Sequence, residues 1–101
     1  MSSAHAKDQA ELTIRDDPEK LRFVASIGEE AVGIAAYEIE DDRIVFTHTV
    51  VDEELEGRGV GSTLVKGALD EARAKGLKVG AKCSFVQAFM DKNPEYRDLI
   101  G

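Results

Sequence analysis

The chain has 101 residues and a formal net charge of −7, and 33% of its residues are charged and 43% hydrophobic. These values predict one compact domain that does not bind nucleic acid, because such binding depends mainly on Lys and Arg, whereas an acidic surface favours cationic partners. No apolar run reaches the roughly 20 residues of a membrane helix and no signal peptide opens the chain, so we expect a cytoplasmic protein without a membrane partner.

The beginning of the chain predicts a tail followed by two strands. Residues 1–9 are small and polar, which indicates a flexible tail before a single domain over residues 10–101. In the first strand, Leu12 and Ile14 alternate with polar residues until Asp-Asp-Pro at 16–18 ends the run. Residues 21–27 alternate in the same way. We expect these two strands to pair in antiparallel orientation.

Two longer apolar runs follow. Residues 31–40 carry apolar side chains on both parities, so this third strand is either buried on both faces near its start or contains a bulge. Asp41 and Asp42 predict a tight turn into a fourth strand over residues 43–51. That strand is also apolar on both parities, which predicts a place in the middle of the sheet with cover on both faces.

The pattern then changes to helical spacing. Apolar residues recur from Val60 to Ala72 as on one face of a helix, and Gly76 is well placed to end it. A short fifth strand over residues 77–83 should pair parallel to the fourth, because a helix connects the two. The sequence therefore predicts a crossover helix between the last two strands of the sheet.

The end of the chain predicts short helices. Ser84 and Gln87 fit a capping box at the start of one helix, and Asn93 with Pro94 fits the start of a last helical turn. The fold class is therefore α/β (α+β), with a mixed five-stranded sheet whose first four strands are antiparallel. A crossover helix follows the fourth strand, and short helices lie at the C-terminus.

Three closely spaced glycines, Gly57, Gly59 and Gly61, precede or open the crossover helix. Glycine permits backbone conformations closed to other residues, so several N–H groups can converge on one point. A helix start adds unpaired amides and the positive end of the helix dipole. The spacing fits neither a P-loop nor a dinucleotide motif. The loop predicts a phosphate or pyrophosphate ligand, and a purely structural loop is the alternative.

The stretch VVDEELEGRGVGSTLV, residues 50–65, resembles the acetyl-CoA-binding motif of the GNAT superfamily of N-acetyltransferases. The stretches VFTHT, GLKVGAKC and CSFVQAFMDKNPEY extend the resemblance over nearly the whole chain, toward a short, single-domain YjdJ-type subgroup. The resemblance implies a minimal GNAT-like fold, acetyl-CoA as acyl donor, and a small-molecule or peptide amine as acceptor. It also implies a shallow acceptor pocket, since elements that frame this pocket in larger members are absent from the sequence.

The resemblance also assigns residues to two parts of CoA. Around the pyrophosphate, mostly through backbone N–H groups, it places Gly57, Arg58, Gly59, Val60, Gly61 and Ser62. Beside the pantetheine arm, between splayed fourth and fifth strands, it places Thr49, Val50 and Val51. The side chain of Arg58 either contacts phosphate or is a solvated loop charge. Two positions depart from the family pattern: Glu56 replaces the usual Gln or Arg, and Asn93 replaces a His.

Cys83, His48 and Tyr96 are the candidates for chemistry. Cys83 precedes the predicted N-cap, where the helix dipole should lower its pKa, and the resemblance puts it near the thioester; it is either catalytic or a small buried hydrophobe. His48 is either a core histidine or a base for the amine. Tyr96 is a possible substitute for the tyrosine that protonates the CoA thiolate in many relatives. One cysteine and two separated histidines give no metal-ligand spacing, so we expect no metal site.

These observations together predict an acetyl-CoA-dependent N-acetyltransferase with an unidentified amine acceptor, which is a monomer or a weak homodimer. A non-catalytic acetyl-CoA or CoA-binding module is the alternative, because no side chain is an unambiguous base. A small interaction protein that kept the fold is a third possibility.

Overall fold

The computed structural model describes residues 12–55 and 57–101. The five strands of its sheet lie in the order β1-β2-β3-β4-β5. Their bounds are β1 Leu12–Asp17, β2 Arg22–Ile27, β3 Glu30–Glu40, β4 Arg43–Val51 and β5 Lys78–Ala81. The first four strands pair antiparallel and β5 pairs parallel to β4, which confirms the predicted topology. The predicted tail, residues 1–9, lies outside the described residues.

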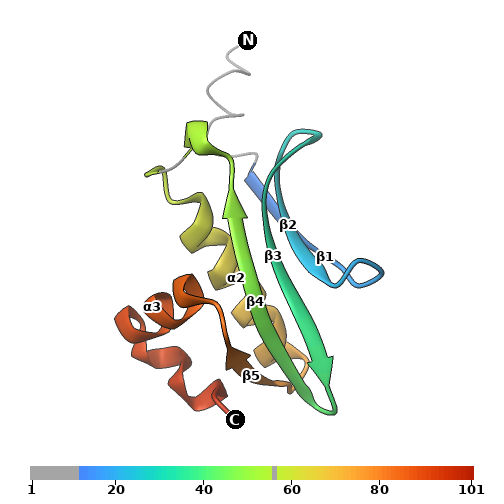
Figure 1. Ribbon diagram of the computed structural model, residues 1–101, viewed down its shortest axis with the longest axis vertical. Helices are drawn as coiled ribbons and strands as arrows, with labels where there is room; N and C mark the ends of the chain where they lie inside the picture. Colours follow the sequence, from blue (N-terminus) through green and yellow to red (C-terminus); the bar gives the residue numbers. More distant parts are fainter. Residues whose placement is uncertain (1–11, 56) are drawn as a thin grey trace.

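Helices follow β4 and β5. Their bounds are η1 Glu53–Leu55, α2 Val60–Ala74, α3 Ser84–Lys92 and η2 Pro94–Leu99, where η marks a 3₁₀ helix. Helix α2 crosses one face of the sheet, and α3 with η2 lies beside β5 (Figure 1). Gly76 follows the end of α2 in the left-handed conformation at φ +73°, as a C-terminal stop requires. Within the described residues, none of the helices is long and apolar enough to cross a membrane.

One hydrophobic core joins α2 to the sheet. The sheet contributes three aromatic rings, Phe23, Tyr37 and Phe46, whose centroids lie 5.4–6.3 Å apart. From α2, Leu64 and Leu69 are fully buried against them in the same cluster. Because burying one such side chain stabilises a fold by about 1.5–3 kcal/mol, this contact fixes α2 on the sheet.

Strand β1 is longer than the sequence predicted. It continues through Asp16 and Asp17, where the Asp-Asp-Pro signal predicted a break. The Tyr37 hydroxyl donates a 2.6 Å hydrogen bond to Asp16, and Arg22 lies 3.8 Å from Asp17. These partners on β2 and β3 hold the two carboxylates within the sheet, so the strand ends only before Pro18.

Strand β3 contains the bulge that its sequence allowed. Ala31 pairs with Ser26 and Gly33 pairs with Ala25, so Val32 is an extra residue opposite β2. An extra residue inverts the alternation of side chains along the strand. The bulge therefore explains why β3 has apolar residues at both odd and even positions. Of the two interpretations of this strand, the one with a bulge is confirmed.

Strand β4 contains a second bulge, which the sequence did not reveal. Ala36 and Tyr37 are neighbours on β3, but their partners on β4 are His48 and Phe46, so Thr47 is the extra residue. Before the bulge, the side chain of Phe46 faces the core with α2. After the bulge, the residues that face α2 are the odd-numbered ones, because the parity has changed.

Because of this bulge, the burial of β4 differs from what the sequence predicted. Its first half is buried on both faces, since Val45 and Phe46 are each 1% exposed. Its second half is not, because His48 and Val50 are exposed and Val50 retains 58% of its accessible surface. The prediction of cover on both faces is therefore wrong beyond Thr47. The apolar residues of β4 face α2 at even positions before the bulge and at odd positions after it, so the strand as a whole is not buried on both faces.

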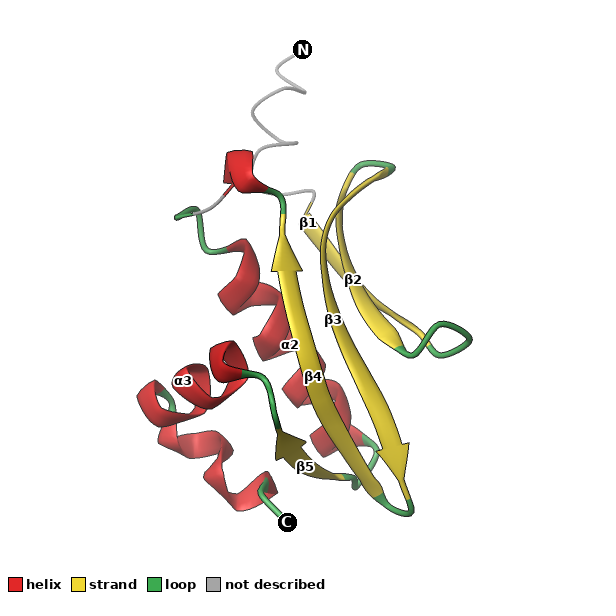
Figure 2. Ribbon diagram, viewed as in Figure 1, coloured by secondary structure: helices red, strands yellow, loops and turns green. Residues whose placement is uncertain are grey.

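Strands β4 and β5 part at Phe46. Their pairing runs only from Arg43 opposite Lys78 to Phe46 opposite Ala81. The N–H groups of Lys82 and Cys83 then both donate to the Phe46 carbonyl, at 2.9 and 3.2 Å, as the chain turns into α3. Past this turn β4 continues without β5 and stays paired with β3 (Figure 2). The splayed strands implied by the family resemblance are therefore present.

The cap of α3 differs from the prediction by one residue. Helix α3 begins at Ser84, but its N-cap is Cys83, whose backbone is extended at φ −84° and ψ 127°. The side chain of Gln87 donates to the carbonyl of Ala81 at 2.8 Å instead of closing a capping box. The capping-box prediction is wrong because the turn out of β5 places the extended residue one position earlier.

The last residues are tied back to α2 and β5. Arg73 of α2 donates to the Asp98 carboxylate at 2.8 Å and to the Glu95 carbonyl at 2.8 Å. Ile100 forms a parallel bridge with Val79, and the Gly101 N–H donates to the Val79 carbonyl at 3.3 Å. The segment after α3 therefore continues the sheet beside β5.

Candidate active site

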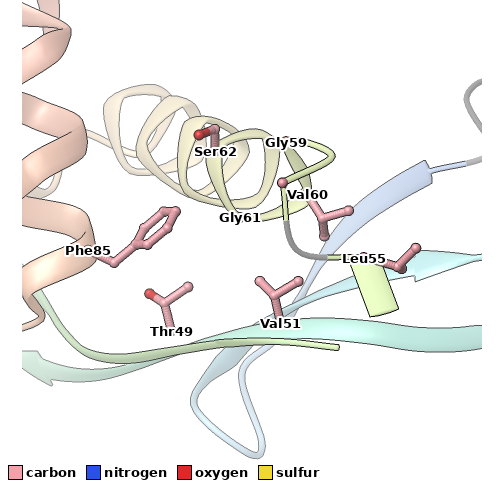
Figure 3. A pocket seen from close by; sticks show the side chains of 9 residues that line it. Thr49, Val51, Leu55, Gly59, Val60, Gly61, Ser62 and Phe85 are labelled. Carbon is pink, nitrogen blue, oxygen red and sulfur yellow. The ribbon is translucent and has the colours of Figure 1, made fainter. Parts of the chain in front are cut away.

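A cavity of about 340 Å³ lies beside the end of β4 that β5 leaves unpaired. It is bounded by β4, by the start of α2 and by the start of α3. Its lining residues are Thr49, Val51, Leu55, Gly57, Gly59, Val60, Gly61, Ser62 and Phe85. Figure 3 shows the side chains of Thr49 and Val51 pointing from β4 toward the first turn of α2, with the Phe85 ring between β4 and α2.

The glycine loop presents backbone amides to this cavity. Gly57 and Gly59 have φ values of +85° and +82°, which glycine adopts without strain, and Gly59 is the N-cap of α2. The first helical bond of this turn runs from the Thr63 N–H to the Gly59 carbonyl, at 2.9 Å. The amides of Val60 to Ser62 precede it and point out of the helix start, and the first turn contains no acidic residue. This is a fitting site for an anion such as a pyrophosphate.

Gly61 has a different role from the other two glycines. It lies inside α2 and does not have a positive φ. A methyl group at this position would lie 2.7 Å from Cζ of Phe85. We predicted that all three glycines allow unusual backbone conformations, and this is wrong for Gly61. It is small because the ring of Phe85 packs over it.

Most residues that the resemblance assigned to CoA line the cavity, but two do not. Val50 points to the opposite face of the sheet, since Thr49 and Val51 point inward and side chains alternate along a strand. Arg58 is exposed, and its N–H donates to the Leu55 carbonyl at 3.1 Å. That amide is therefore occupied in a turn, and only the Arg58 side chain remains for a ligand. Glu56, the departure from the family motif, lies outside the described residues.

Cys83 lies behind the wall of the cavity, against Thr49. Its side chain is buried, and its Sγ is 3.4 Å from the Thr49 Oγ1. Burial tends to raise the pKa of the thiol, but the Thr49 hydroxyl and the amides of Val86 and Phe85 at the start of α3 stabilise the thiolate. The pKa of Cys83 is consequently lower than that of an ordinary cysteine. The direction expected from its place at a helix start is confirmed.

His48 and Tyr96 lie outside the cavity lining. His48 is exposed on the sheet face opposite α2, so its interpretation as a core histidine is wrong. Tyr96 is 4% exposed, and its hydroxyl donates a 2.7 Å hydrogen bond to Asp70. Burial and this contact raise the pKa of Tyr96, which joins η2 to α2. Among residues 12–55 and 57–101, no three His, Cys, Asp or Glu side chains gather as a metal site would require.

Two residues of the cavity, Leu55 and Phe85, are not predicted from the sequence. Leu55 ends η1, which the sequence presents only as an acidic loop. Phe85 is 41% exposed at the start of α3, next to the buried Val86. A large aromatic residue adjacent to the apolar stripe of a helix is a signal of a ligand surface, but many exposed aromatic residues have no such role.

Comparison with known protein families gives a match to one segment of the chain. This segment contains the glycine loop, the parted strands and the cavity. The family model for GCN5-related N-acetyl-transferases matches residues 22–99. The chain belongs to the GCN5-related N-acetyltransferase family. A GCN5-like N-acetyltransferase candidate from Staphylococcus aureus, solved by NMR, is 30% identical and superposes with a TM-score of 0.70 over 92% of this chain and 91% of that one.

Two further matches concern a curated relative and a solved structure. The protein NATD1 from Homo sapiens is 36% identical over 62 residues, which cover 60% of this chain and 55% of NATD1. The match therefore spans about half the length of this curated relative. An N-acetylglutamate synthase from Neisseria gonorrhoeae, solved with coenzyme A and N-acetyl-glutamate, has a TM-score of 0.55 at 19% identity over 77% of this chain and 20% of that one. This last likeness concerns the fold alone.

Proposed function

We propose that the protein is an N-acetyltransferase that transfers the acetyl group of acetyl-CoA to a small-molecule or peptide amine. The observation that carries this proposal is the cavity between the end of β4, which β5 does not reach, and the amide-rich start of α2. Family membership supports acyl transfer, and the acidic composition supports a cationic acceptor. On the sequence grounds given above, we place the reaction in the cytoplasm.

In this proposal, the two sides of the cavity hold different parts of CoA. The amides of Val60, Gly61 and Ser62 bind the pyrophosphate, and the positive charge of the exposed Arg58 side chain adds to this attraction. The backbone of β4 from Thr49 to Val51 offers N–H and C=O groups on the edge that β5 has left. The amide groups of the pantetheine arm can pair with this edge as an added strand would.

The chemistry of direct transfer needs few side chains. The neutral acceptor nitrogen attacks the thioester carbonyl carbon, the carbon–sulfur bond breaks, and CoA leaves as a thiolate. Holding the two reactants in contact supplies up to about 7–11 kcal/mol of the barrier reduction. Backbone N–H groups on the free edge of β4 stabilise the developing oxyanion. We propose that the amine approaches the thioester through the gap between β4 and β5, from the face that carries His48, and that His48 takes the proton that the amine loses.

A second route uses Cys83, and its contact with Thr49 favours it. The Cys83 thiolate attacks the thioester carbon, CoA leaves as a thiolate, and the acetyl group is held as a new thioester on Sγ. The acceptor amine then attacks that carbon, the bond to Sγ breaks, and the cysteine thiolate is restored. The proton of the amine goes to His48 or to water. Because Sγ lies behind Thr49, this route needs a small outward movement of one side chain.

Release of free thiol from acetyl-CoA in the presence of a panel of amines tests the proposed function. An acetyltransferase releases thiol at a rate that depends on the amine. A protein that is stabilised against heat by CoA but releases no thiol with any amine is a binding module. A protein that neither releases thiol nor is stabilised by CoA has the family's fold without its activity, and that result contradicts the proposal.

Mass spectrometry after incubation with acetyl-CoA alone separates the two routes. If Cys83 carries the acetyl group, a single acetyl mass is found on this residue, and Cys83→Ser loses both the label and most of the turnover while it still binds CoA. If transfer is direct, the parent protein remains unlabelled and the serine variant stays active, because serine keeps the volume of the side chain nearly unchanged.

A further inference from the structure

A second cavity, of about 280 Å³, lies at the other end of α2 from the site described above. That site meets α2 at residues 59–62, whereas the second cavity is lined by Glu71, Ala72 and Lys75, where α2 ends. The turn between β1 and β2 and the hairpin of β3 and β4 complete its walls. We call this space the Leu21 cavity, after the exposed leucine at its rim.

The walls of the Leu21 cavity are mainly apolar. Phe23 and Tyr37 are both buried, and their rings, with centroids 5.4 Å apart, lie at its inner side. Leu21 and Ile39 line it from the outside, where they keep 42% and 50% of their accessible surface. Exposed apolar side chains that gather around a hollow are typical of a surface that binds an apolar group.

The backbone of Leu21 is unusual for a leucine. Its φ is +54°, in the left-handed region that side chains with a Cβ rarely adopt. Its N–H donates to the Pro18 carbonyl at 3.3 Å, and its carbonyl accepts from the Tyr37 N–H at 2.9 Å. A glycine would adopt this conformation without strain. What the leucine adds is a side chain that forms one wall of the cavity.

An ammonium group already lies at the mouth of the Leu21 cavity. Lys75 Nζ is 3.4 Å from Asp16 Oδ2 and 3.3 Å from Glu71 Oε2, and all three residues line the cavity. The Tyr37 hydroxyl donates to the other oxygen of Asp16, Oδ1, at 2.6 Å, which orients this carboxylate. The Lys75 side chain is 51% exposed, and exposed ion pairs of this kind are weak. The ammonium group of a ligand can therefore replace that of Lys75.

We propose that the Leu21 cavity binds a small primary amine with a compact apolar body. The apolar body lies against Leu21 and Phe23, and the ammonium group takes the place of Lys75 Nζ between Asp16 and Glu71. Two carboxylates and one ammonium line the mouth, and this balance favours a cation over an anion. Ligand pockets begin near about 300 Å³, so a cavity of about 280 Å³ admits only a small ligand. This binding requires neither CoA nor the proposed function.

Chemical-shift titration of the parent protein without CoA tests the proposal with three probes of similar size. These are 2-phenylethylamine, which is a cation, 2-phenylethanol, which is neutral, and 3-phenylpropionate, which is an anion. We expect the amine to bind most tightly and to shift the amides of Leu21, Ile39 and Ala72. Equal affinities for the amine and 3-phenylpropionate would overturn the proposed ligand class. Shifts confined to Thr49 and Val51 would place the amine at the CoA site and overturn the Leu21 cavity as its binding site.

Two substitutions at the mouth should have opposite effects on binding of 2-phenylethylamine. Lys75→Gln removes the competing ammonium group, so it should tighten binding about two- to fivefold. Glu71→Gln removes a carboxylate that pairs with the ligand and should weaken binding by a similar factor. Lys66→Gln is the matched control, because it breaks the pair with Asp70 on the same helix and should leave the affinity unchanged. Weaker binding of the amine by Lys75→Gln would overturn the proposal.

Leu21→Gly separates ligand binding from stability. It removes one wall of the cavity and also relieves the left-handed backbone. We therefore expect weaker binding of 2-phenylethylamine together with a melting temperature that is unchanged or higher. An unchanged affinity in this variant would overturn the role of Leu21 in the site. A failure to bind CoA or to release thiol from acetyl-CoA would contradict the proposed function alone.

Discussion

Thr49 is the residue where the cavity and the buried thiol meet. It lies after the bulge on β4, so it faces α2 and lines the cavity, and its hydroxyl is 3.4 Å from Cys83 Sγ. A threonine in this place stabilises the thiolate without adding a charge. The contact couples any movement of Cys83 toward the cavity to the side chain of Thr49.

The pH dependence of alkylation measures this coupling. Because the pKa of Cys83 is lowered, iodoacetamide should react with it at a lower pH than with an ordinary cysteine. Thr49→Val removes one of the groups that stabilise the thiolate, so the rate profile should move to higher pH. Thr13→Val, on β1, is the matched control and should leave the profile in place. A profile that is the same in all three proteins would contradict the assigned role of Thr49.

The three glycines should respond differently to alanine. Gly59→Ala forces a side chain into the left-handed region and should lower the free energy of unfolding by about 1–2 kcal/mol. Gly61→Ala keeps a helical backbone, so it should change stability little but displace the Phe85 ring and weaken CoA binding. Gly28→Ala, in the turn after β2, should lose stability and keep CoA binding. Chemical denaturation and calorimetry with CoA distinguish these outcomes.

Tyr96 should matter for stability and not for turnover. Its hydroxyl bonds to Asp70 in a partly buried contact, so Tyr96→Phe should lower the free energy of unfolding by about 1 kcal/mol. Burial works against ionisation of Asp70, but the contacts from Tyr96 and Lys66 outweigh it and lower the pKa of that carboxyl. The stability that Asp70 contributes is therefore present at neutral pH and is lost as acid protonates it. A loss of turnover in Tyr96→Phe, with stability unchanged, would instead make Tyr96 the acid for the CoA thiolate.

At the scale of elements, the bulge at Thr47 decides which side chains of β4 meet α2. Because Thr47 is the extra residue, its deletion joins Phe46 directly to His48, and regular alternation then keeps Thr49 and Val51 on the side of α2 and His48 and Val50 on the opposite face. We therefore expect the deletion variant to keep CoA binding, measured by calorimetry on protein that thermal denaturation shows to be folded. Thr47→Ser, which keeps the residue count and the bulge, should also preserve binding. Loss of CoA binding by a folded deletion variant would show that the bulge does more for the site than set which side chains face α2.

Much of the element structure could be predicted from the sequence, since it follows from local patterns. The glycines and the periodic stripe from Val60 to Ala72 fix α2, and alternation with turn residues fixes β1 and β2. The bulge in β4 could not be predicted, because apolar residues on both parities are equally consistent with a strand buried on both faces. The contact of Gly61 with Phe85 joins residues far apart in sequence, and no local pattern contains it.

At the scale of the whole molecule, the site lies where elements from both halves of the chain converge. Strand β4 and η1 supply one wall, α2 supplies the amides, and α3 supplies Phe85. The sequence placed the glycine loop and Cys83 in this region through local motifs and family resemblance. It did not place Leu55 or Phe85, because their positions depend on how η1 and α3 pack beside α2.

The tie between the last residues and β5 has a consequence for local unfolding. Strand β5 has four residues, and its outer edge is bridged by Ile100 to Val79. The same strand leads to the two amides that hold the Phe46 carbonyl, where β4 and β5 part. If the final turn opened, β5 would lose the bridge on its outer edge and keep only its pairing with β4, and the mouth of the cavity would loosen with it. The end of the chain and the entrance to the site therefore belong to one cooperative unit, although no residue after Phe85 lines the cavity.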